Sequence, residues 1–395
     1  SLLNTCVGAG VPNFIFASSS SVYGTSINED GSFKMIEYDG YLDRSRLGAL
    51  ILAEGSLYSK RFFSDFQKIL IKNKNRNTLK AIYQFTHEYK KIDFIDATNS
   101  PIFGEIDQGI TVSDQSRFIE QEHKVILSSD LNKIGKFNFQ YSLTNWSNNF
   151  KTYDKENPDN IIYNLQENQS NISINWIKKF NKYSFELNFN NSLNENFKSD
   201  YLSFNIKGNP IKNIDFELSS SLIEKSPNFN FKLFRSAYES YNWFNQDLDN
   251  QKIKNLNLKI SFREFIVLTG DYNLIDNYTF FRESTNALTG ETDLKRLAIV
   301  NQFNDEIKYY SLKLYSKVDF GKFSLVNTAK LQKKEQNLSL TDLSTINVPE
   351  WITRNTIMYS TNVFNNSLFI QTGITFNYFT KYFADYYNPL ISEFV

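Results

Sequence analysis

The sequence predicts an all-β fold, a large antiparallel up-and-down transmembrane β-barrel. Apolar and polar residues alternate in one segment after another, as in Phe137, Phe139, Tyr141 and Leu143. A period of two places the apolar side chains of a strand on one face and the polar side chains on the other. Many such strands joined by turn residues indicate one long antiparallel sheet with an apolar and a polar face.

The alternation recurs along most of the chain. Further runs in which every second residue is apolar occur at 183–189, 202–206, 214–218, 229–233 and 256–262. We therefore expect strands near 13–23, 33–41, 47–58, 62–71, 79–96, 118–130, 136–147, 171–178, 182–194, 200–207, 211–223, 228–236, 253–263, 265–273, 305–319, 322–334, 354–364 and 367–382. Almost no helix is expected between them.

The connections between these strands fall into two lengths. Short turns are expected at 132–135, 180–181, 208–210 and 365–366, and long polar connections at 97–117, 148–170, 237–252, 276–304 and 335–353. Short turns at one rim and long loops at the other are typical of membrane barrels. Strands of roughly 8–12 residues also suit the 9–11 residues that cross a bilayer at a tilt.

The apolar face of such a sheet meets either a protein core or lipid, and the composition favours lipid. The chain is rich in Phe (36) and Tyr (23) but has only 15 Gly and 7 Pro. Soluble β-sandwiches, the alternative, have shorter strands and turns rich in Gly and Pro. Aromatic clusters near strand ends, at 238–243, 278–281, 309–310 and 386–387, are interpreted as girdles at the membrane interface.

The charge balance argues against nucleic acid as a partner. Lys and Arg total 43, and Asp and Glu also total 43, so there is no net basic field to attract phosphates. The charged residues lie between apolar ones, as on the wet face of a strand. No apolar run approaches the length of about 18 residues that a transmembrane helix needs, so strands would have to cross the membrane.

Few residues suited to catalysis or metal binding are present. Cys6 is the single cysteine, which excludes a disulfide framework or a thiolate metal cluster. His87 and His123 are the two histidines, whereas a metal site needs three or four converging ligands. We interpret His87 as a polar residue facing the lumen and His123 as part of a solvated strand start. No enzyme activity, cofactor or metal is expected.

Several segments carry a resemblance to a known family. The runs VPEWITRNT at 348–356 and QTGITFNYFTKYFADYYNP at 371–389 lie near the C-terminus, and LDRSRL and KRFF occur at 42–47 and 60–63. Over residues 28–395 the chain resembles the "putative porin" family of Bacteroidetes outer-membrane β-barrels. The resemblance implies a Gram-negative outer-membrane location. It also implies a barrel incomplete at both ends, because family members have further strands on either side.

The first 27 residues are treated as a separate segment. The run FIFASSSSVYG at 14–24 resembles the strand that bears the catalytic serine in nucleotide-sugar epimerases. The glycine-rich dinucleotide loop that would precede it is missing. An NAD-dependent epimerase fragment is therefore kept as a remote alternative to a first barrel strand.

The resemblance implies a porin-like channel for passive diffusion of small polar solutes, with outer-membrane lipid around it. Polar residues that alternate with the apolar set would then line the lumen: Arg44, Arg46, Asn138, Gln140, Glu186 and Asn188. Arg44 and Arg46 lie two residues apart and share a face, either as an arginine ladder that favours anions or as an ion-paired wall. A non-conducting scaffold or adhesin barrel is the alternative, and a homo-oligomer is left open.

Overall fold

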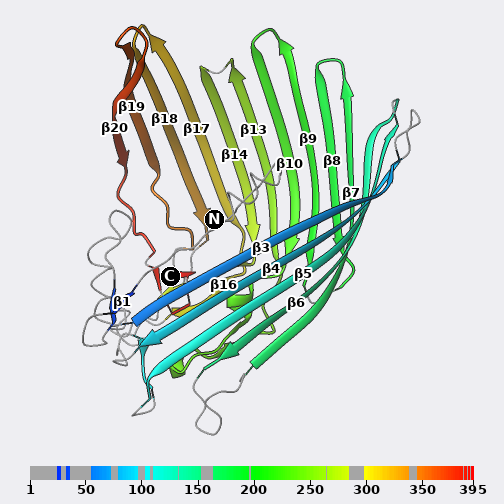
Figure 1. Ribbon diagram of the computed structural model, residues 1–395, viewed down its shortest axis with the longest axis vertical. Coiled ribbons are helices and arrows are strands. Elements are labelled where there is room, and N and C mark those ends of the chain that lie inside the picture. Colours follow the sequence, from blue (N-terminus) through cyan, green and yellow to red (C-terminus); the bar gives the residue numbers. More distant parts are fainter. Residues whose placement is uncertain are drawn as a thin grey trace.

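One large antiparallel sheet dominates the protein, as the ribbon in Figure 1 shows. The computed structural model describes residues 25–27, 33–35, 55–72, 79–96, 103–106, 110–131, 133–152, 163–194, 197–263, 265–283, 298–337, 345–385, 387–388, 390–391 and 393–395. Within these ranges the protein is nearly all β, and the main sheet has 14 strands. The all-β, up-and-down fold class predicted from the alternation is confirmed.

Strands that follow one another in the chain lie side by side in the sheet. Their order across the sheet is β20-β19-β18-β17-β14-β13-β10-β9-β8-β7-β6-β5-β4-β3, and every neighbouring pair is antiparallel. The strands are β3 (Gly55–Lys72), β4 (Lys80–Asp96), β5 (Val112–Leu131), β6 (Gly135–Lys151), β7 (Tyr163–Phe180), β8 (Tyr183–Ser192), β9 (Ser199–Ile211), β10 (Ile214–Lys225), β13 (Gln251–Phe262), β14 (Ile266–Asp276), β17 (Ile307–Phe320), β18 (Phe323–Gln336), β19 (Trp351–Val363) and β20 (Leu368–Phe379).

Shorter elements lie before, between and after the strands of this sheet. They are β1 (Thr25–Ile27), β2 (Phe33–Met35), helix α3 (Phe229–Lys232), β11 (Leu233–Phe234), the 3₁₀ turn η2 (Glu239–Tyr241), β12 (Trp243–Phe244), β15 (Tyr278–Glu283), β16 (Ala298–Phe303), β21 (Tyr387–Asn388) and β22 (Glu393–Phe394). The predicted strand 228–236 is therefore wrong. Its alternating aromatic residues form one helical turn and a two-residue strand, because their rings pack into a core and do not join the sheet.

Asparagine occupies left-handed positions in three of the tight turns at one end of the sheet. Asn181, Asn213 and Asn365 have positive φ values of 49°, 67° and 53°, and asparagine tolerates this left-handed conformation better than most residues. The turn predicted at 208–210 is wrong, because β9 continues to Ile211. Pro210 instead lies in a bulge opposite Asp215, where a missing N–H group is tolerated.

Several strands extend further than the hydrophobic pattern predicted. Predicted strands 47–58 and 62–71 overlap a single strand, β3. The expected connections 97–117 and 148–170 are shorter, because β5 begins at Val112, β6 runs to Lys151 and β7 begins at Tyr163. In these extensions polar residues occupy both faces, so the apolar alternation does not mark them. The expected strand 13–23 lies outside the described residues.

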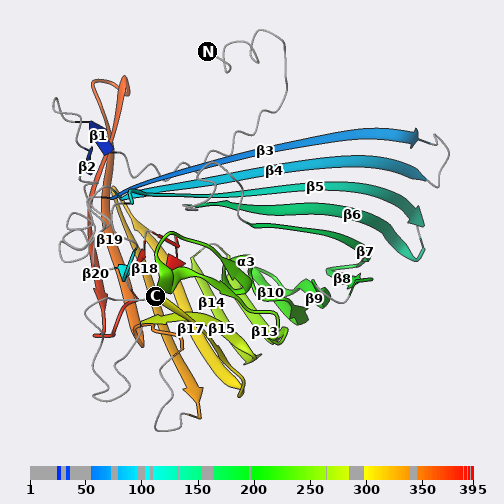
Figure 2. The same ribbon diagram turned by 90° about the horizontal axis from the view of Figure 1, so that it is seen from below.

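The sheet curls into a barrel-like shape with a concave and a convex face. Figure 2 shows β3–β6 across from β14, β17 and β18, with α3, β15 and the C-terminal end between them. Within the described ranges, the two edge strands β3 and β20 each pair on one side only. The main buried core lies inside the curl, where Phe94, Val112 and Phe150 of the sheet pack with residues of the connections and of the chain end.

Candidate functional site

Exposed apolar side chains cover the convex face of the sheet. On β6, Phe139, Tyr141 and Leu143 are 43%, 37% and 44% exposed, whereas the intervening Ser142 and Thr144 are buried on the concave side. Further exposed apolar side chains lie on the convex face of the other strands: Val125, Leu127, Ile174, Phe189, Leu202, Phe204, Leu222, Leu256, Leu258, Ile260, Phe262, Ile266, Leu268, Leu312, Leu314, Phe323, Leu331, Ile357 and Ile374. Apolar patches of this extent mark a surface that contacts another apolar medium.

The apolar surface forms a band that is shorter than the longest strands. Beyond Leu143, the convex residues of β6 become Asn145, Ser147 and Asn149, although the strand continues to Lys151. A band bounded by polar strand extensions matches the outward face of a membrane barrel, which projects beyond the lipid on one side. None of the described helices is long and apolar enough to cross a membrane.

Both histidines lie on the convex face, so the prediction that His87 faces the lumen is wrong. His123 is exposed, as expected, but it lies within β5 and not at the start of the strand. His87 is opposite Gln121, and the His123 ring lies 4.9 Å from the Phe85 ring, with Tyr83 OH 2.7 Å from His123 Nδ1. The odd-numbered residues of β4 and β5 form this face. Within the described ranges no group of three or more His, Cys, Asp or Glu side chains is placed to hold a metal ion.

Polar side chains cover the concave face. The sequence-predicted lumen residues Asn138, Gln140, Glu186 and Asn188 all lie there, whereas Arg44 and Arg46 lie outside the described residues. The registers place these four residues on the same side as Phe94, Val112 and Phe150. Their role in lining a pore stays a prediction.

Asn175, which sequence reasoning missed, joins three of the four predicted residues. Its amide accepts a hydrogen bond from Asn138 Nδ2 (2.9 Å) and donates to Asn188 Oδ1 (2.6 Å) and Glu186 Oε1 (3.2 Å). Asn188 Nδ2 in turn donates to Ser203 Oγ (3.2 Å). Asparagine suits such a ladder because its amide both donates and accepts, and the alternation around Trp176 could have placed Asn175 on this face.

The connection between β10 and β13, residues 226–250, folds into the concavity and is here called the inward segment. It contains α3, β11, η2 and β12. Tyr238 and Tyr241 are fully buried, and the Phe234 ring stacks on Trp243 at 5.2 Å. The interpretation of 238–243 as a girdle at the membrane interface is therefore wrong, because these aromatic rings belong to the core inside the curl. The same holds for Phe281.

Two carboxylates of the sheet anchor the inward segment. Asp114 of β5 is buried and accepts hydrogen bonds from Ser236 Oγ, Thr152 Oγ1 and the backbone N–H of Ala237, the last at 3.0 Å. Asp96 of β4, also buried, accepts one from Tyr238 OH. These hydrogen bonds tie the inward segment to the wall of the sheet, in addition to its apolar packing.

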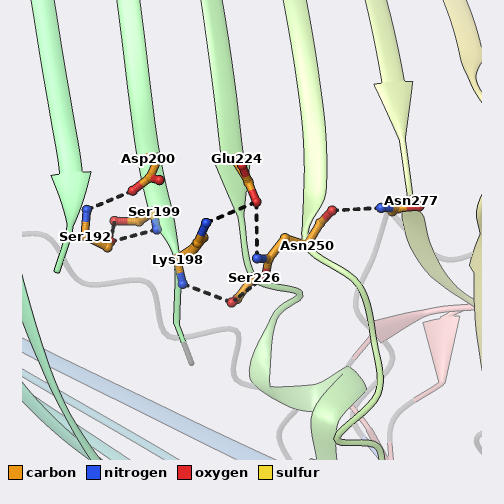
Figure 3. Close-up of polar contacts among 8 residues, drawn as sticks. All are labelled: Ser192, Lys198, Ser199, Asp200, Glu224, Ser226, Asn250 and Asn277. Atoms are coloured by element: carbon orange, nitrogen blue, oxygen red, sulfur yellow. Dashed lines mark hydrogen bonds and ion pairs between the residues drawn. The ribbon is translucent and has the colours of Figure 1, made fainter. Parts of the chain in front are cut away.

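A chain of polar contacts holds the base of the inward segment at the rim of the sheet, as Figure 3 shows. Ser226 Oγ accepts from the backbone N–H of Lys198 (3.1 Å) and donates to Asn250 Oδ1 (3.0 Å). Asn277 Nδ2 donates to the backbone oxygen of Asn250 (3.1 Å), and Lys198 Nζ lies 3.6 Å from Glu224 Oε1. The rim thus connects the ends of β9, β10, β13 and β14.

The C-terminal residues close the core from the other side. Asn388 Nδ2 donates to Tyr241 OH (2.9 Å), and burial raises the pKa of Tyr241 to about 12. Asn230 Nδ2 donates to Glu393 Oε1 (2.9 Å). Burial raises the pKa of Glu393 above its usual value, with the bond from Asn230 opposing the shift. Burial also lowers the pKa of Lys232, whose Nζ lies 4.4 Å from the Phe197 ring centre.

The raised pKa of Glu393 predicts that the C-terminal segment packs more tightly in acid. A carboxyl with a raised folded-state pKa stabilises fully below its unfolded pKa, and this contribution is lost as the pH rises through the folded value. Glu393→Gln keeps an oxygen acceptor for Asn230 and removes the charge. At pH 7 we expect slower hydrogen exchange around 390–395 in the variant than in the native chain, and equal exchange near pH 4. Equal rates at both pH values would contradict the prediction.

The fold resembles solved structures at low sequence identity. The siderophore receptor PirA from Acinetobacter baumannii aligns with a TM-score of 0.52 and 12% identity, covering 77% of this chain and 48% of that one. The copper transporter OprC aligns with a TM-score of 0.53 and 8% identity, covering 77% and 50%. This chain therefore spans about half the length of the solved structures it matches. At these identities the likeness concerns the fold alone.

The sequence itself identifies the family. No curated protein matches the chain. Residues 26–395, which include the whole sheet and the inward segment, match the family described as "Putative porin". This match covers far more than half of the chain and agrees with the sheet whose convex face is apolar and whose concave face is polar. The chain belongs to the "Putative porin" family.

Proposed function

We propose that this protein is a porin-like barrel of the Gram-negative outer membrane, through which small polar solutes diffuse passively. The observation that carries the proposal is the division of one curled sheet into an apolar convex band and a polar concave face. Lipid surrounds the band, because apolar side chains exposed in this number are stable only outside water. Solutes pass along the face that bears Asn138, Gln140, Glu186 and Asn188.

The function is transport and not catalysis. The polar side chains of the concave face bind one another in ladders, such as Asn255 Nδ2 to Asn273 Oδ1 at 2.7 Å and Tyr309 OH to Gln332 Oε1 at 2.6 Å. Side chains held in this way form a fixed hydrophilic wall. Solute passage requires such a wall, with weak contacts at many positions.

One observation favours a second candidate, a barrel that does not conduct. The inward segment and the C-terminal residues pack a continuous apolar core inside the curl, where Tyr238, Leu233 and Ile391 are almost fully buried. A connection anchored in this way narrows the passage through the barrel. If it fills the whole cross-section, the passage is closed. The same protein would then act as an outer-membrane scaffold or adhesin.

Replacing the inward segment distinguishes the two functions. Lys225 and Gln251 are directly paired, so Asn-Gly in place of residues 226–250 joins β10 and β13 as a two-residue hairpin without changing their register. We expect the native chain to show measurable conductance in planar bilayers. The hairpin variant should show a conductance about threefold higher or more, since the cross-section freed by the removed segment also carries current. Replacing the turn at 212–213 with Asn-Gly is the control and should leave conductance unchanged. Absence of current from all three folded proteins would refute the channel.

A further inference from the structure

The strand registers bring lysines that are distant in sequence into one transverse row on the concave face. Ser184 pairs with Lys179 and Lys207, and Glu217 pairs with Lys207 and Lys259. The row continues on the other side of Lys259. The members of this lysine row, from β7 to β18, are Lys179, Ser184, Lys207, Glu217, Lys259, Thr269, Lys313 and Lys330.

The lysine row carries a strong excess of positive charge. Glu217 is its one carboxylate, and its Oε1 lies 2.8 Å from Lys207 Nζ. Glu217 also accepts a hydrogen bond from Asn205 Nδ2 at 2.9 Å, so this carboxylate is already engaged. Lys330 Nζ donates to Tyr309 OH (3.1 Å), a neutral partner that leaves its charge uncompensated.

The adjacent row of the concave face, toward the long connections, carries acidic and no basic side chains. It contains Glu186 and Asp271, separated by Asn and Ser residues. Amide and hydroxyl groups solvate both carboxylates: Asn175 donates to Glu186 at 3.2 Å, and Ser311 Oγ donates to Asp271 at 3.1 Å. This row therefore carries no base, and the positive charge is concentrated in the lysine row beside it.

A cavity lies at one end of the lysine row. Lys179, Lys207 and Lys259 line it together with Ser184 and Glu217, and its volume is about 440 Å³. Ammonium groups bind phosphate as point charges, and a serine hydroxyl adds a donor. Lys182 and Asp215 also line the cavity, and Asp215 accepts a hydrogen bond from Asn209 Nδ2 at 2.9 Å. The volume accommodates a hydrated oxyanion, and four lysines against two engaged carboxylates favour an anion over a cation.

We propose that the lysine row selects anions, and that small oxyanions of the phosphate class bind in the cavity at Lys179, Lys207 and Lys259. This proposal rests on the proposed channel function and gives it a substrate class. Rings of lysine and arginine side chains are the means by which pores favour anions and phosphate. Because the five lysines stand on strands of one hydrogen-bonded sheet, their spacing does not depend on the inward segment.

Selectivity in planar bilayers tests the row. The variant K259Q/K313Q/K330Q removes three charges from the concave face, and K254Q/K308Q/K333Q removes three from the convex face of the same strands. From reversal potentials in a KCl gradient, we expect the native chain to prefer chloride. The concave variant should lower the chloride-to-potassium permeability ratio about tenfold, as expected when a steering field is removed. The convex variant should resemble the native chain. A cation-selective native channel, or equal effects of the two variants, would overturn the proposal.

Equilibrium binding separates failure of this proposal from failure of the channel. Inorganic phosphate is titrated calorimetrically into the full chain refolded in detergent. The same titration is made with the cavity variant K179Q/K259Q and with its matched control, the convex-face variant K254Q/K308Q. We expect K179Q/K259Q to weaken phosphate binding at least about tenfold, since two charge-assisted hydrogen bonds to the anion are lost. Phosphate binding without conductance would retain the site and remove the channel. Absence of phosphate binding to the native chain would remove the site.

Discussion

Asp114→Ala is expected to release the inward segment from the wall of the sheet. Asp114 accepts hydrogen bonds from Ser236, Thr152 and Ala237, and these groups become buried without an acceptor in the variant. A buried donor left without an acceptor costs about 1–3 kcal/mol, so we expect a loss of roughly 3 kcal/mol or more from the packing of the segment. The released segment should be cut by protease between residues 226 and 250 while the sheet stays intact.

Two further variants make the Asp114 result specific. Asp114→Asn keeps an oxygen acceptor but no charge, and its effect should lie between those of the native chain and Asp114→Ala. Asp247→Ala removes an exposed carboxylate of the same segment and should leave protease sensitivity unchanged. Equal protection of the segment in Asp114→Ala and in the native chain would show that the aromatic core alone holds it in place.

Leu258→Lys is expected to lower the free energy of unfolding of the protein much more in a lipid bilayer than in detergent. Leu258 lies on the convex face, is 42% exposed and has Leu256 and Ile260 as its neighbours on that face. A lysine facing the midplane of a bilayer costs about 2–4 kcal/mol. The measurement is the free energy of unfolding of the protein refolded into lipid vesicles.

The adjacent residue of the same strand provides the matched control for Leu258. Asn257 faces the concave side and donates to Asp271, so Asn257→Lys replaces a hydrogen bond by an ion pair. We expect a change in stability below about 1 kcal/mol, as for ion pairs in contact with water. Similar losses for the two variants would mean that both faces meet the same medium, and the membrane assignment would be wrong.

Residues of the concave face could be predicted where the alternation is strong. Around Phe139 and Leu187 the sequence alone placed Asn138, Gln140, Glu186 and Asn188 on the polar side, and the registers agree. The prediction failed where the segment was aromatic but did not belong to the sheet. Phe229 and Phe231 alternate as they would in a strand, yet α3 turns their rings toward Phe197 and Phe281.

The histidines show a second limit of the sequence pattern. His87 was assigned to the lumen because it is polar, but the parity of β4 places it with Tyr83 and Phe85. Polarity indicates the wet face only inside the apolar band. Beyond the band both faces of a strand meet water, so polar residues occur on either side and position in the alternation is the better guide.

The all-β class, the positions of most strands and the face on which each strand carries its apolar residues follow from the sequence alone. These properties are local, since a period of two orients each side chain relative to its neighbours. The residues that meet across strands, the lysine row and the placement of residues 226–250 in the concavity became visible only in the folded chain. Strand register and loop packing depend on contacts between residues far apart in the chain, and no local periodicity encodes them.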